Sequence, residues 1–263
     1  MCIRDRDQDA DLEWLTAEPD VTWFLKPADS QAFRRCFGRK AIRVNSLAEA
    51  QEILARCREH GLVMLLQEYV PGSSDRHYLV DGFVDRGGEI LAILARRRIR
   101  MHPRDFGDSS FIRGVRLEEA QPAAEACRRL LGGGAFRGIF SAEFKRDPRD
   151  EQFRLIEVNA RPWAYVGFAQ SCGFNAPAMA YRDALGLPQP ALTLHVEGAR
   201  FQFMPNDLKA AHLAVRQGEL GWVDWLGQSW GAESVLFRFD DPLPALRSGL
   251  DLLQSAAARV FRS

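Results

Sequence analysis

The segment Ser141–Trp163, SAEFKRDPRDEQFRLIEVNARPW, decides the fold that the sequence predicts. Its middle, DPRD at positions 147–150, has the composition of a turn. Apolar residues alternate with polar ones on both sides of this turn, which is the pattern of strands with one buried face. The segment therefore predicts two adjacent antiparallel strands.

A hairpin folded about Asp150 fixes which residues of the two strands face each other. In this register Glu143 lies opposite Glu157, and Ser141 lies opposite Asn159. Successive side chains point to opposite faces of a strand. The expected core face holds Phe140, Ala142, Phe144, Ile156, Val158 and Ala160. The expected polar face holds Glu143, Lys145, Glu157, Asn159 and Arg161.

The polar face predicts a metal site. Two carboxylates roughly 5 Å apart repel each other in a half-buried setting unless a cation lies between them. Carboxylate and amide oxygens, without histidine or thiolate, favour Mg²⁺, with Mn²⁺ as an alternative. The expected ligands are Glu143, Glu157 and Asn159. A solvent-exposed face whose charges pair with Lys145 and Arg161 is the alternative interpretation of the same pattern.

The overall composition excludes several kinds of partner. The 263 residues, 46% of them hydrophobic, are enough for one large domain or two modest ones. The 35 basic residues balance 35 acidic ones, so no global field attracts nucleic acid or an anionic membrane. No apolar run reaches the roughly 18 residues of a membrane span, and the first residues lack the apolar centre of a signal peptide.

Five scattered cysteines favour a cytoplasmic protein. They lie at positions 2, 36, 57, 127 and 172 and form no CxxC motif, so we expect reduced packing residues. The segment Met1–Glu18 is charged, weakly patterned and precedes the first predicted strand. A truncated gene or a misassigned start is one interpretation of it, and an intact start is the other.

A lysine ends the first predicted strand, Val21–Lys26, directly before Pro27. An ammonium group at the end of a buried strand reaches a ligand, an acidic partner or solvent. Residues 28–39 form a polar connection of the kind that makes a flap. The next predicted elements are a strand at Lys40–Val44, a helix that begins with the capping box of Ser46 and Glu49 and ends at Gly61, and a strand at Val63–Val70.

A second hairpin is predicted at Tyr78–Asp85 and Glu89–Arg98. A basic cluster follows along its second strand, where Arg96, Arg98 and Arg100 share a face by period two. These arginines suit phosphate or carboxylate binding, although a solvated edge strand carries similar charges. The chain contains neither a P-loop nor a GxGxxG motif.

The remaining elements are mostly helical. Helices are predicted at 118–131, 177–185, 207–216 and 219–230, one or two strands at 192–203, and a loop at 106–110. From Leu243 to Val260, apolar residues recur at steps of three and four. This periodicity predicts an amphipathic helix, which we expect to pack on its own domain rather than on a partner or a membrane surface.

Taken together, five segments resemble the ATP-grasp superfamily, and most closely its carboxylate–amine ligase branch. They are FLKP at 24–27, QEYVPG at 67–72, RRRIRMHP at 96–103, EFKRDPRD at 143–150 and IEVNARPW at 156–163. The separation of EFK from IEVNAR is the most specific of these features, and the resemblance covers Val21–Leu187. It implies an α+β fold in which two lobes grip ATP.

The resemblance also implies a division of the chain. The implied parts are residues 1–20 as a remnant of a missing N-terminal domain or a disordered segment, 21–70 as the small lobe, 71–188 as the large lobe with the metal site, and 189–263 as a mainly helical C-terminal extension. Family members usually carry a preceding α/β domain of about a hundred residues. Almost nothing precedes Val21 here.

Individual roles follow from the same resemblance. The implied metal ligands are Glu143, Glu157 and Asn159, and the implied catalytic residues are Arg98, Arg100 and Arg161. The implied nucleotide contacts are Lys26 at the phosphates, Lys40, an adenine-facing hinge of Gln67, Glu68, Tyr69 and Val70, and Asp75 at the ribose.

The implied reaction transfers the γ-phosphoryl group of ATP to a small-molecule carboxylate, and an amine or a thiol then attacks the acyl phosphate. The sequence names neither substrate and gives no oligomeric state. Two other functions fit the same residues: a truncated or non-catalytic ATP-binding module, and a small-molecule kinase.

Overall fold

The computed structural model of the protein describes residue 12 and residues 21–104, 106–134, 136–237 and 240–260, with the backbone alone for 252–260. The interpretation of residues 1–20 as a remnant or a disordered segment falls outside the described residues, apart from Leu12. The chain forms two compact units. The first consists of Met1–Gly72 with Asp147–Ile156, and the second consists of Ser73–Arg146 with Glu157–Ser263.

The first unit contains a three-stranded antiparallel sheet and two helices. Its elements are β1 (Trp23–Pro27), α2 (Ser30–Phe37), β2 (Ile42–Val44), α3 (Leu47–Glu59) and β3 (Met64–Glu68). The strand order is β2-β1-β3, so β1 is central and pairs with both neighbours. In the register of β1 with β3, Phe24 lies opposite Gln67 and Lys26 lies opposite Leu65.

A continuous apolar core joins this sheet to its helices. Trp23 and Leu25 of β1 belong to it, together with Phe33 of α2 and Ile53 and Cys57 of α3. Burying an aliphatic or aromatic side chain contributes about 1.5 to 3 kcal/mol each. The first unit therefore holds its two helices by their apolar faces rather than by charge.

Residues 28–39 contain a helix, and the prediction of a flap-like connection is wrong. The carboxylate of Asp29 accepts two backbone N–H groups of the first turn of α2, at 2.9 and 3.0 Å. The helix ends at Gly38, whose φ of 69° is the left-handed conformation that favours glycine. Phe33 anchors the helix in the core with 0% exposure.

The capping box predicted for α3 is present in one half. The N–H of Glu49 donates to Ser46 Oγ at 3.2 Å. The carboxylate of Glu49 accepts the N–H of Asn45 at 2.9 Å, one residue before the N-cap. Both hydrogen bonds satisfy backbone N–H groups near the helix start, and an N-cap such as Ser46 typically contributes about 1 kcal/mol.

The second unit contains a seven-stranded sheet with the order β10-β9-β6-β5-β4-β7-β8, except that residues 153–156 of the edge strand β8 are assigned to the first unit. Its strands are β4 (His77–Val84), β5 (Ile90–His102), β6 (Asp108–Val115), β7 (Gly138–Arg146), β8 (Phe153–Asn159), β9 (Arg200–Gln202) and β10 (Glu233–Ser234). Its helices are η2 (Ser74–Arg76), η3 (Leu117–Ala120), α4 (Gln121–Leu131), α5 (Val166–Ser171), α6 (Ala176–Ala184), α7 (Met204–Arg216), α8 (Trp222–Ser229) and α9 (Leu243–Val260).

Strand β4 sets the register of the central sheet. It pairs antiparallel with β5 on one side and with β7 on the other. Asp81 lies opposite Ser141, and Leu79 lies opposite both Glu143 on β7 and Arg96 on β5. Because opposed residues share a face, Asp81, Arg96, Ser141 and Glu143 point to the same side of the sheet.

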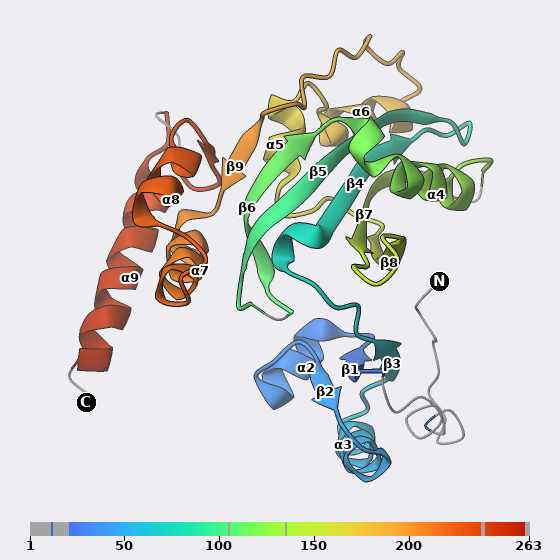
Figure 1. The fold of residues 1–263 in the computed structure, drawn as a ribbon. Coiled ribbons are helices and arrows are strands. Elements are labelled where there is room, and N and C mark those ends of the chain that lie inside the picture. The colour runs from blue at the N-terminus through green and yellow to red at the C-terminus, as the bar shows by residue number, and fades with distance from the viewer. Residues whose placement is uncertain (1–11, 13–20, 105, 135, 238–239, 261–263) are drawn as a thin grey trace. The chain divides into compact units, whose positions relative to one another are not determined.

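The predicted core face is confirmed for β7 but not for the second strand, where Ile156 and Val158 are only half-buried and Ala160 is exposed. Phe140, Ala142 and Phe144 are at most 2% exposed. Helix α4 packs against β4 and β5, and α6 packs against β4 and β7 (Figure 1). A second apolar cluster joins Phe83 of the sheet to Phe168 of α5. The sheet is thus buried by helices, and the polar row that includes Glu143 lies within a largely apolar unit.

Two features of the sheet differ from the prediction. Strand β6 begins at Asp108, whereas the sequence predicts a loop over 106–110, because Asp-Ser-Ser has the composition of a turn. Pairing of Asp108 and Ser109 with His102 and Met101 of β5 extends this strand. Strand β5 continues to His102, beyond its predicted end, because its arginines have acidic partners inside the unit.

Three helices follow β9 and are grouped together beyond that strand (Figure 1). The helices predicted at 207–216, 219–230 and from Leu243 are confirmed as α7, α8 and α9. The segment 192–203 contributes only β9, so most of that predicted strand is wrong. In the described part of the chain, no helix combines the length and the apolar character needed to cross a membrane.

Candidate functional site

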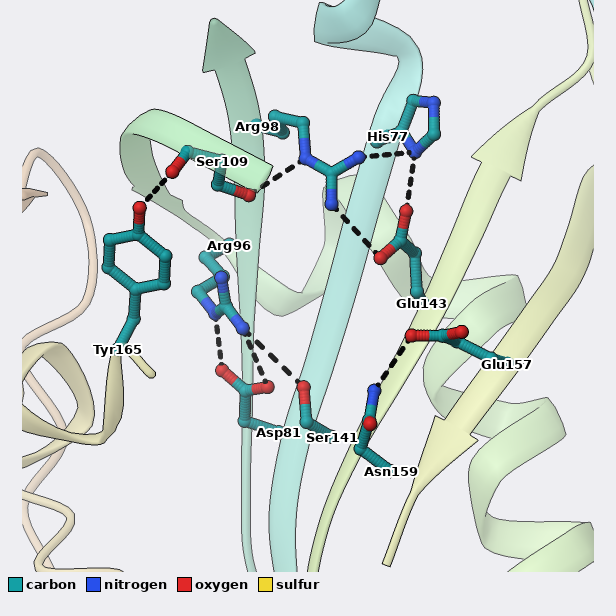
Figure 2. A network of polar contacts seen from close by, with 10 residues as sticks. All are labelled: His77, Asp81, Arg96, Arg98, Ser109, Ser141, Glu143, Glu157, Asn159 and Tyr165. Carbon is teal, nitrogen blue, oxygen red and sulfur yellow. Dashed lines mark hydrogen bonds and ion pairs between the residues drawn. The ribbon is translucent and has the colours of Figure 1, made fainter. Parts of the chain in front are cut away.

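The carboxylate of Glu143, on β7, is held by a side chain of the neighbouring strand β4 and by one of β5, the next strand beyond β4 (Figure 2). His77 Nδ1 lies 2.7 Å from Glu143 Oε1. Arg98 Nη2 donates to Glu143 Oε2 at 3.0 Å. The three side chains are only 6 to 14% exposed. Glu143, His77 and Arg98, called the Glu143 cluster below, form an ion-pair site that is largely shielded from water.

One nitrogen of His77 faces both other members of the Glu143 cluster. Arg98 Nη1 lies 3.0 Å from the same Nδ1 atom that contacts Glu143. A ring nitrogen either donates or accepts, so a proton on Nδ1 serves Glu143 and its absence serves Arg98. The guanidinium is fixed from its other side, because Arg98 Nε donates to Ser109 Oγ at 2.8 Å and the Tyr165 hydroxyl donates to the Ser109 carbonyl.

Burial and charge act against each other on the carboxyl group of Glu143. Burial raises its pKa, but the positive charge of Arg98 and the hydrogen bond from His77 outweigh burial, and the pKa lies well below its ordinary value. Burial lowers the pKa of His77 and Arg98 adds to this, against the hydrogen bond to Glu143. At neutral pH the cluster therefore contains a carboxylate, a guanidinium and a neutral imidazole.

A second, fully buried ion pair lies beside the Glu143 cluster on the same face (Figure 2). Arg96 Nε donates to Asp81 Oδ2 at 2.6 Å, and Arg96 Nη2 lies 3.4 Å from Ser141 Oγ. The guanidinium lies 5.9 Å from the ring centre of Trp163 and 5.8 Å from that of Tyr165. Side chains that are 0 to 2% exposed have no access to a ligand, so this pair supports the sheet.

The two predicted metal ligands of β8 contact each other. Asn159 Nδ2 donates to Glu157 Oε1 at 3.0 Å (Figure 2). Their strand lies next to β7 in the sheet, as predicted. The carboxamide oxygen of Asn159 is the atom that suits a cation, because it is the acceptor of the group, whereas the amide nitrogen only donates and does so to Glu157.

The turn predicted between β7 and β8 is present. Asp147 N–H donates to the carbonyl of Gln152 at 2.8 Å and closes it. If regular antiparallel pairing of β7 with β8 continues from Asp147 opposite Gln152, Glu143 lies opposite Ile156. The predicted register, with Glu143 opposite Glu157, therefore requires a shift of one residue between the strands and stays a prediction.

The predicted ligand set matches Mg²⁺ in the type of its donors. Each oxygen of Glu143 accepts one hydrogen bond and keeps a further lone pair. Within the residues described, no three histidine, cysteine, aspartate or glutamate side chains come together as a metal site. A cation site here thus depends on two carboxylates and the carboxamide of Asn159, and their joint coordination stays a prediction.

The predicted hinge lies at the end of β3 in the first unit. Gln67 is 4% exposed, and its Oε1 accepts no hydrogen bond from any described residue. A buried acceptor without a partner suits an N–H donor of a ligand, such as the amino group of adenine. Tyr69 N–H donates to the carbonyl of Thr22 at 2.7 Å. Glu68 accepts a hydrogen bond of 2.6 Å from Arg149.

The other nucleotide contacts expected in the first unit are two lysines and a valine. Lys26 on β1 and Lys40 before β2 are half-buried, and Val70 is buried. These residues belong to the first unit, whereas Glu143, Glu157 and Asn159 belong to the second. Their participation in one nucleotide site stays a prediction.

A family model described as "ATP-grasp in the biosynthetic pathway with Ter operon" matches residues 61–205, more than half of the chain. The chain belongs to the ATP-grasp family. The matched range includes the hinge, the Glu143 cluster and both strands that carry the predicted metal ligands of this ATP-grasp protein.

Two curated relatives are ligases. D-aspartate ligase of Enterococcus faecium (strain Aus0004) is 23% identical over 164 residues, which are 60% of this chain and 39% of the relative. D-alanine–D-alanine ligase of Acidiphilium cryptum (strain JF-5) is 30% identical over 143 residues, 48% of this chain and 44% of the relative. The ATP-grasp chain thus spans less than half the length of the curated relatives it matches.

Solved structures confirm the predicted α+β, ATP-grasp fold. Carboxyaminoimidazole ribonucleotide synthase from Aspergillus clavatus, complexed with ATP, superposes with a TM-score of 0.53 at 20% identity. The match covers 74% of this chain and 49% of that one. At this level of identity the likeness extends to the fold of the ATP-grasp chain and not to its substrates.

The arginines of β5 divide between separate networks in this ATP-grasp chain. The prediction that Arg96, Arg98 and Arg100 share a face is wrong for Arg100, because the register of β5 with β6 shifts between Arg98 and Arg100. Arg100 binds Asp207 of α7 through two hydrogen bonds of 2.8 Å each. Its guanidinium lies 4.4 Å from the ring centre of Phe111. A catalytic role for Arg100 is thus a prediction about a side chain with an acidic partner.

Two further residues implied by the ATP-grasp resemblance have local partners. Asp75 accepts a hydrogen bond of 2.8 Å from Arg97 and another from the hydroxyl of Ser73. Arg161 is exposed, and its Nη1 donates to the carbonyl of Pro162 at 3.1 Å. Neither contact tests the nucleotide role of Asp75 or the phosphoryl role of Arg161, which stay predictions.

Sequence reasoning missed His77, Asp81 and Asp207 in this ATP-grasp chain. A signal existed for Asp81, because a carboxylate in the apolar run HYLVDGFV requires a buried partner, and Arg96 on the paired strand provides it. His77 opens the same run, one residue before the predicted start of its strand. Asp207 carried no such signal, since its partner Arg100 lies 107 residues earlier.

Proposed function

We propose that the chain carries the nucleotide and metal site of an ATP- and Mg²⁺-dependent ligase, which activates a carboxylate as an acyl phosphate for attack by an amine. The Glu143 cluster is the observation that carries the proposal. It presents an ionised carboxylate that Arg98 and His77 hold in one orientation, on the central sheet of an ATP-grasp chain. An oriented carboxylate of this kind is what a phosphate-bound metal requires.

Glu143, Glu157 and Asn159 would hold the metal. When bound, Mg²⁺ offsets negative charge on the phosphate oxygens of ATP and orients the γ-phosphoryl group. Arg98 and His77 fix the side chain of Glu143 before any ligand binds, so that little orientation has to be imposed afterwards. Mn²⁺ takes the same oxygen donors and is the expected substitute.

In the first unit, residues of β1 and β3 would hold the nucleotide. The partnerless Oε1 of Gln67 accepts the adenine amino group in this proposal, and the backbone of Glu68, Tyr69 and Val70 lies along the rest of the base edge. Lys26 and Lys40 contribute positive charge at the phosphates, and Asp75 of the second unit contacts the ribose. Each contact corresponds to a position that the ATP-grasp resemblance implies.

The proposed reaction has two steps. A carboxylate oxygen of the substrate attacks the γ-phosphorus, the bond from that phosphorus to the bridging oxygen breaks, and ADP leaves. The amine nitrogen then attacks the acyl carbon, and the carbon–oxygen bond to phosphate breaks. Arg161, with Arg98 or Arg100, offsets charge on the phosphoryl oxygens during transfer. Exclusion of water protects the acyl phosphate from hydrolysis.

Amino acids are the first substrates to test, because the curated relatives are named for aspartate and alanine. A thiol is an alternative nucleophile for the same acyl phosphate. We place the protein in the cytoplasm, a proposal that rests on the scattered cysteines, of which Cys36, Cys57, Cys127 and Cys172 are free thiols.

Calorimetric titration of ATP into the chain, with and without Mg²⁺, tests the proposal. We expect wild-type protein to bind ATP more tightly with Mg²⁺, and Glu157→Gln to lose most of this difference, because the substitution removes one negative ligand. Glu118→Gln is the matched control, since Glu118 is exposed and lies on η3, outside the proposed site. Binding without any Mg²⁺ effect, or an unchanged effect in Glu157→Gln, would contradict the metal assignment.

Product analysis separates the ligase from the two alternatives. A ligase releases ADP and inorganic phosphate only when both a carboxylate and an amine are present. A kinase releases ADP with a stable phosphorylated product and needs no amine. A non-catalytic module binds ATP and releases no ADP with any pair of substrates.

A further inference from the structure

A cavity of about 300 Å³ lies within the second unit, apart from the residues that contact Glu143. Its walls come from the last part of β5, the start of η2, helix α7, the segment between α7 and α8, and Gln228 of α8. The volume is at the lower end of the range found for small-molecule sites, about 300 to 1,000 Å³. Asp75 and Arg100, which the family resemblance associates with ligands, both line it.

One wall of the cavity is apolar. Ala210, Leu213 and Ala214 of α7 line it at steps of three and one, so they belong to one face of the helix. Ile99 and Met101 of β5 line it as well. The two alanines have short side chains, so they leave space for an aliphatic group of a ligand beside larger apolar neighbours.

Two arginines line the same cavity. Within the described residues, Arg100 uses three of its five donor hydrogens, on Asp207 and on Gln228, and keeps two. Arg104 Nη2 donates to both carboxylate oxygens of Glu219, at 2.7 and 2.8 Å, and Nη1 donates to Gln217, but the side chains of Arg104 and Glu219 are both 49% exposed. An exposed pair of this kind is weak, so Arg104 is available to a ligand carboxylate at little cost.

The acidic groups of the cavity balance these arginines. Asp75 and Glu219 line it together with Arg100 and Arg104. Arg100 is neutralised by Asp207, and Asp75 is neutralised by Arg97. A ligand with a net charge therefore adds an uncompensated charge in a partly enclosed space, whereas a zwitterion adds none and still finds a partner for each of its charges.

We infer that this cavity binds an α-amino acid with an aliphatic side chain, which serves as the amine substrate. The carboxylate lies at Arg100 and Arg104, the ammonium lies at Asp75 or Glu219, and the side chain packs on Ala210 and its neighbours on α7. The assignment of this amino acid as a substrate rests on the proposed ligase function, whereas its binding to the cavity does not. Arg98 lies two residues before Arg100 on β5, roughly 7 Å along a strand, so the cavity and the Glu143 cluster adjoin the same strand.

The chemical step balances with this ligand. The ammonium loses a proton, and its nitrogen lone pair attacks the acyl carbon of the acyl phosphate. The bond from that carbon to the phosphate oxygen breaks, and the departing phosphate takes up one proton. The nitrogen loses a second proton, which reaches solvent, and the amide remains with one N–H.

Calorimetric titration of the full chain with L-leucine and D-leucine tests the inference. We expect one enantiomer to bind at least tenfold more tightly than 4-methylpentanoate, which lacks the ammonium, and 3-methylbutylamine, which lacks the carboxylate. Glycine, which lacks the side chain, is the third comparison and is expected to bind at least tenfold more weakly. Equal affinity for leucine and for either singly charged analogue would overturn the inference.

Two variants locate the binding site. Ala214→Phe fills the apolar part of the cavity and is expected to weaken leucine binding at least tenfold. Arg104→Gln, a substitution at a half-exposed position that preserves the fold, is expected to weaken it several-fold. Arg129→Gln on the exposed face of α4 is the matched control and leaves it unchanged. Unchanged binding in Ala214→Phe and in Arg104→Gln would overturn the assignment to this cavity.

ATP with Mg²⁺, titrated in parallel, separates this inference from the proposed function. ATP binding without leucine binding overturns the inference and leaves the nucleotide site in place. Leucine binding without ATP binding supports the cavity and contradicts the proposed ligase. Competition between leucine and ATP would also overturn the inference, because the cavity would then belong to the nucleotide.

Discussion

Two arginines on β5, Arg98 and Arg100, bind carboxylates that differ in how completely they are hydrogen-bonded. Asp207, the partner of Arg100, is 0% exposed and accepts from Arg100 twice and from Ser110, Gln202 and Trp225. Arg100, Ser110, Gln202, Trp225 and Asp207 are called the Asp207 cluster below. Glu143, the partner of Arg98, accepts one hydrogen bond on each oxygen and is 14% exposed.

The difference separates a structural carboxylate from one that suits a ligand. A carboxylate offers about four lone-pair positions, and the five hydrogen bonds of Asp207 occupy all of them. Glu143 keeps about two. Arginines of one strand, β5, thus have different effects. Arg100 binds a fully bonded carboxylate and stabilises the junction with α7, whereas Arg98 orients a carboxylate that keeps free lone pairs.

The largest effect is expected from Asp207→Asn. The substitution removes the charge that compensates buried Arg100, so we expect the free energy of unfolding to fall by about 3 to 5 kcal/mol. Urea denaturation followed by tryptophan fluorescence measures it, because Trp225 donates to Asp207. Asp241→Asn, at an exposed position, is the control. A loss below 1 kcal/mol would show that the Asp207 cluster does not support the fold.

A smaller loss of stability, with a larger loss of ligand binding, is expected from Glu143→Gln. Removing the hydrogen-bonded charge is expected to cost about 1 to 3 kcal/mol. The Mg²⁺-dependent part of ATP affinity is expected to fall about 10- to 100-fold, as for a lost metal ligand or its support. Calorimetry with and without Mg²⁺ measures it, and an unchanged metal effect would place Glu143 with Asp207 as a structural carboxylate.

The pH dependence of stability tests the same comparison. Burial raises the pKa of Asp207, but the hydrogen bonds from Arg100 outweigh it and the pKa is lowered. A carboxyl group with a lowered pKa in the folded state stabilises the fold above its unfolded pKa of about 4, and this contribution is lost as the pH falls. We therefore expect the difference in stability between wild type and Asp207→Asn to be full at about pH 7 and to shrink at about pH 3. A difference that grows towards acid pH would contradict the assignment.

The smallest effect is expected for an arginine–carboxylate pair at the surface. Arg116 Nε lies 3.9 Å from Glu197 Oε1, and both side chains are more than 70% exposed. Arg116→Gln is expected to change the free energy of unfolding by less than about 0.5 kcal/mol. Denaturation at low and high salt measures it. A loss comparable to that of Asp207→Asn would show that burial does not distinguish these pairs.

The sequence predicts those parts of the molecule that depend on local pattern. Alternation over EFKR and RLIEVN is enough to predict β7, β8 and the turn between them. The apolar steps after Leu243 are enough to predict α9. The ATP-grasp family follows from short segments in a fixed order, and the family match over 61–205 confirms it.

The parts that the sequence does not predict depend on distant partners. A shift of register between Arg98 and Arg100 sends the second arginine to Asp207, and no local pattern encodes that irregularity. His77 approaches Glu143 across 66 positions of sequence. Strand β6 begins at residues of loop composition because Asp108 and Ser109 pair with the end of β5. Tertiary pairing overrides local preference in each case.

The buried pair of Asp81 and Arg96 has a consequence for the accuracy of the Glu143 cluster. Arg96 on β5 ties Asp81 on β4 to Ser141 on β7, and thereby links three strands at one level of the sheet. If any one of these strands shifted by a single residue, its side chain in this link would point to the opposite face of the sheet. A charged group would then be left without a partner in the interior. The Asp81–Arg96 ion pair therefore favours a single register of the three strands. That register also sets the spacing of His77, Arg98 and Glu143 further along the same strands, although the pair itself is closed to solvent.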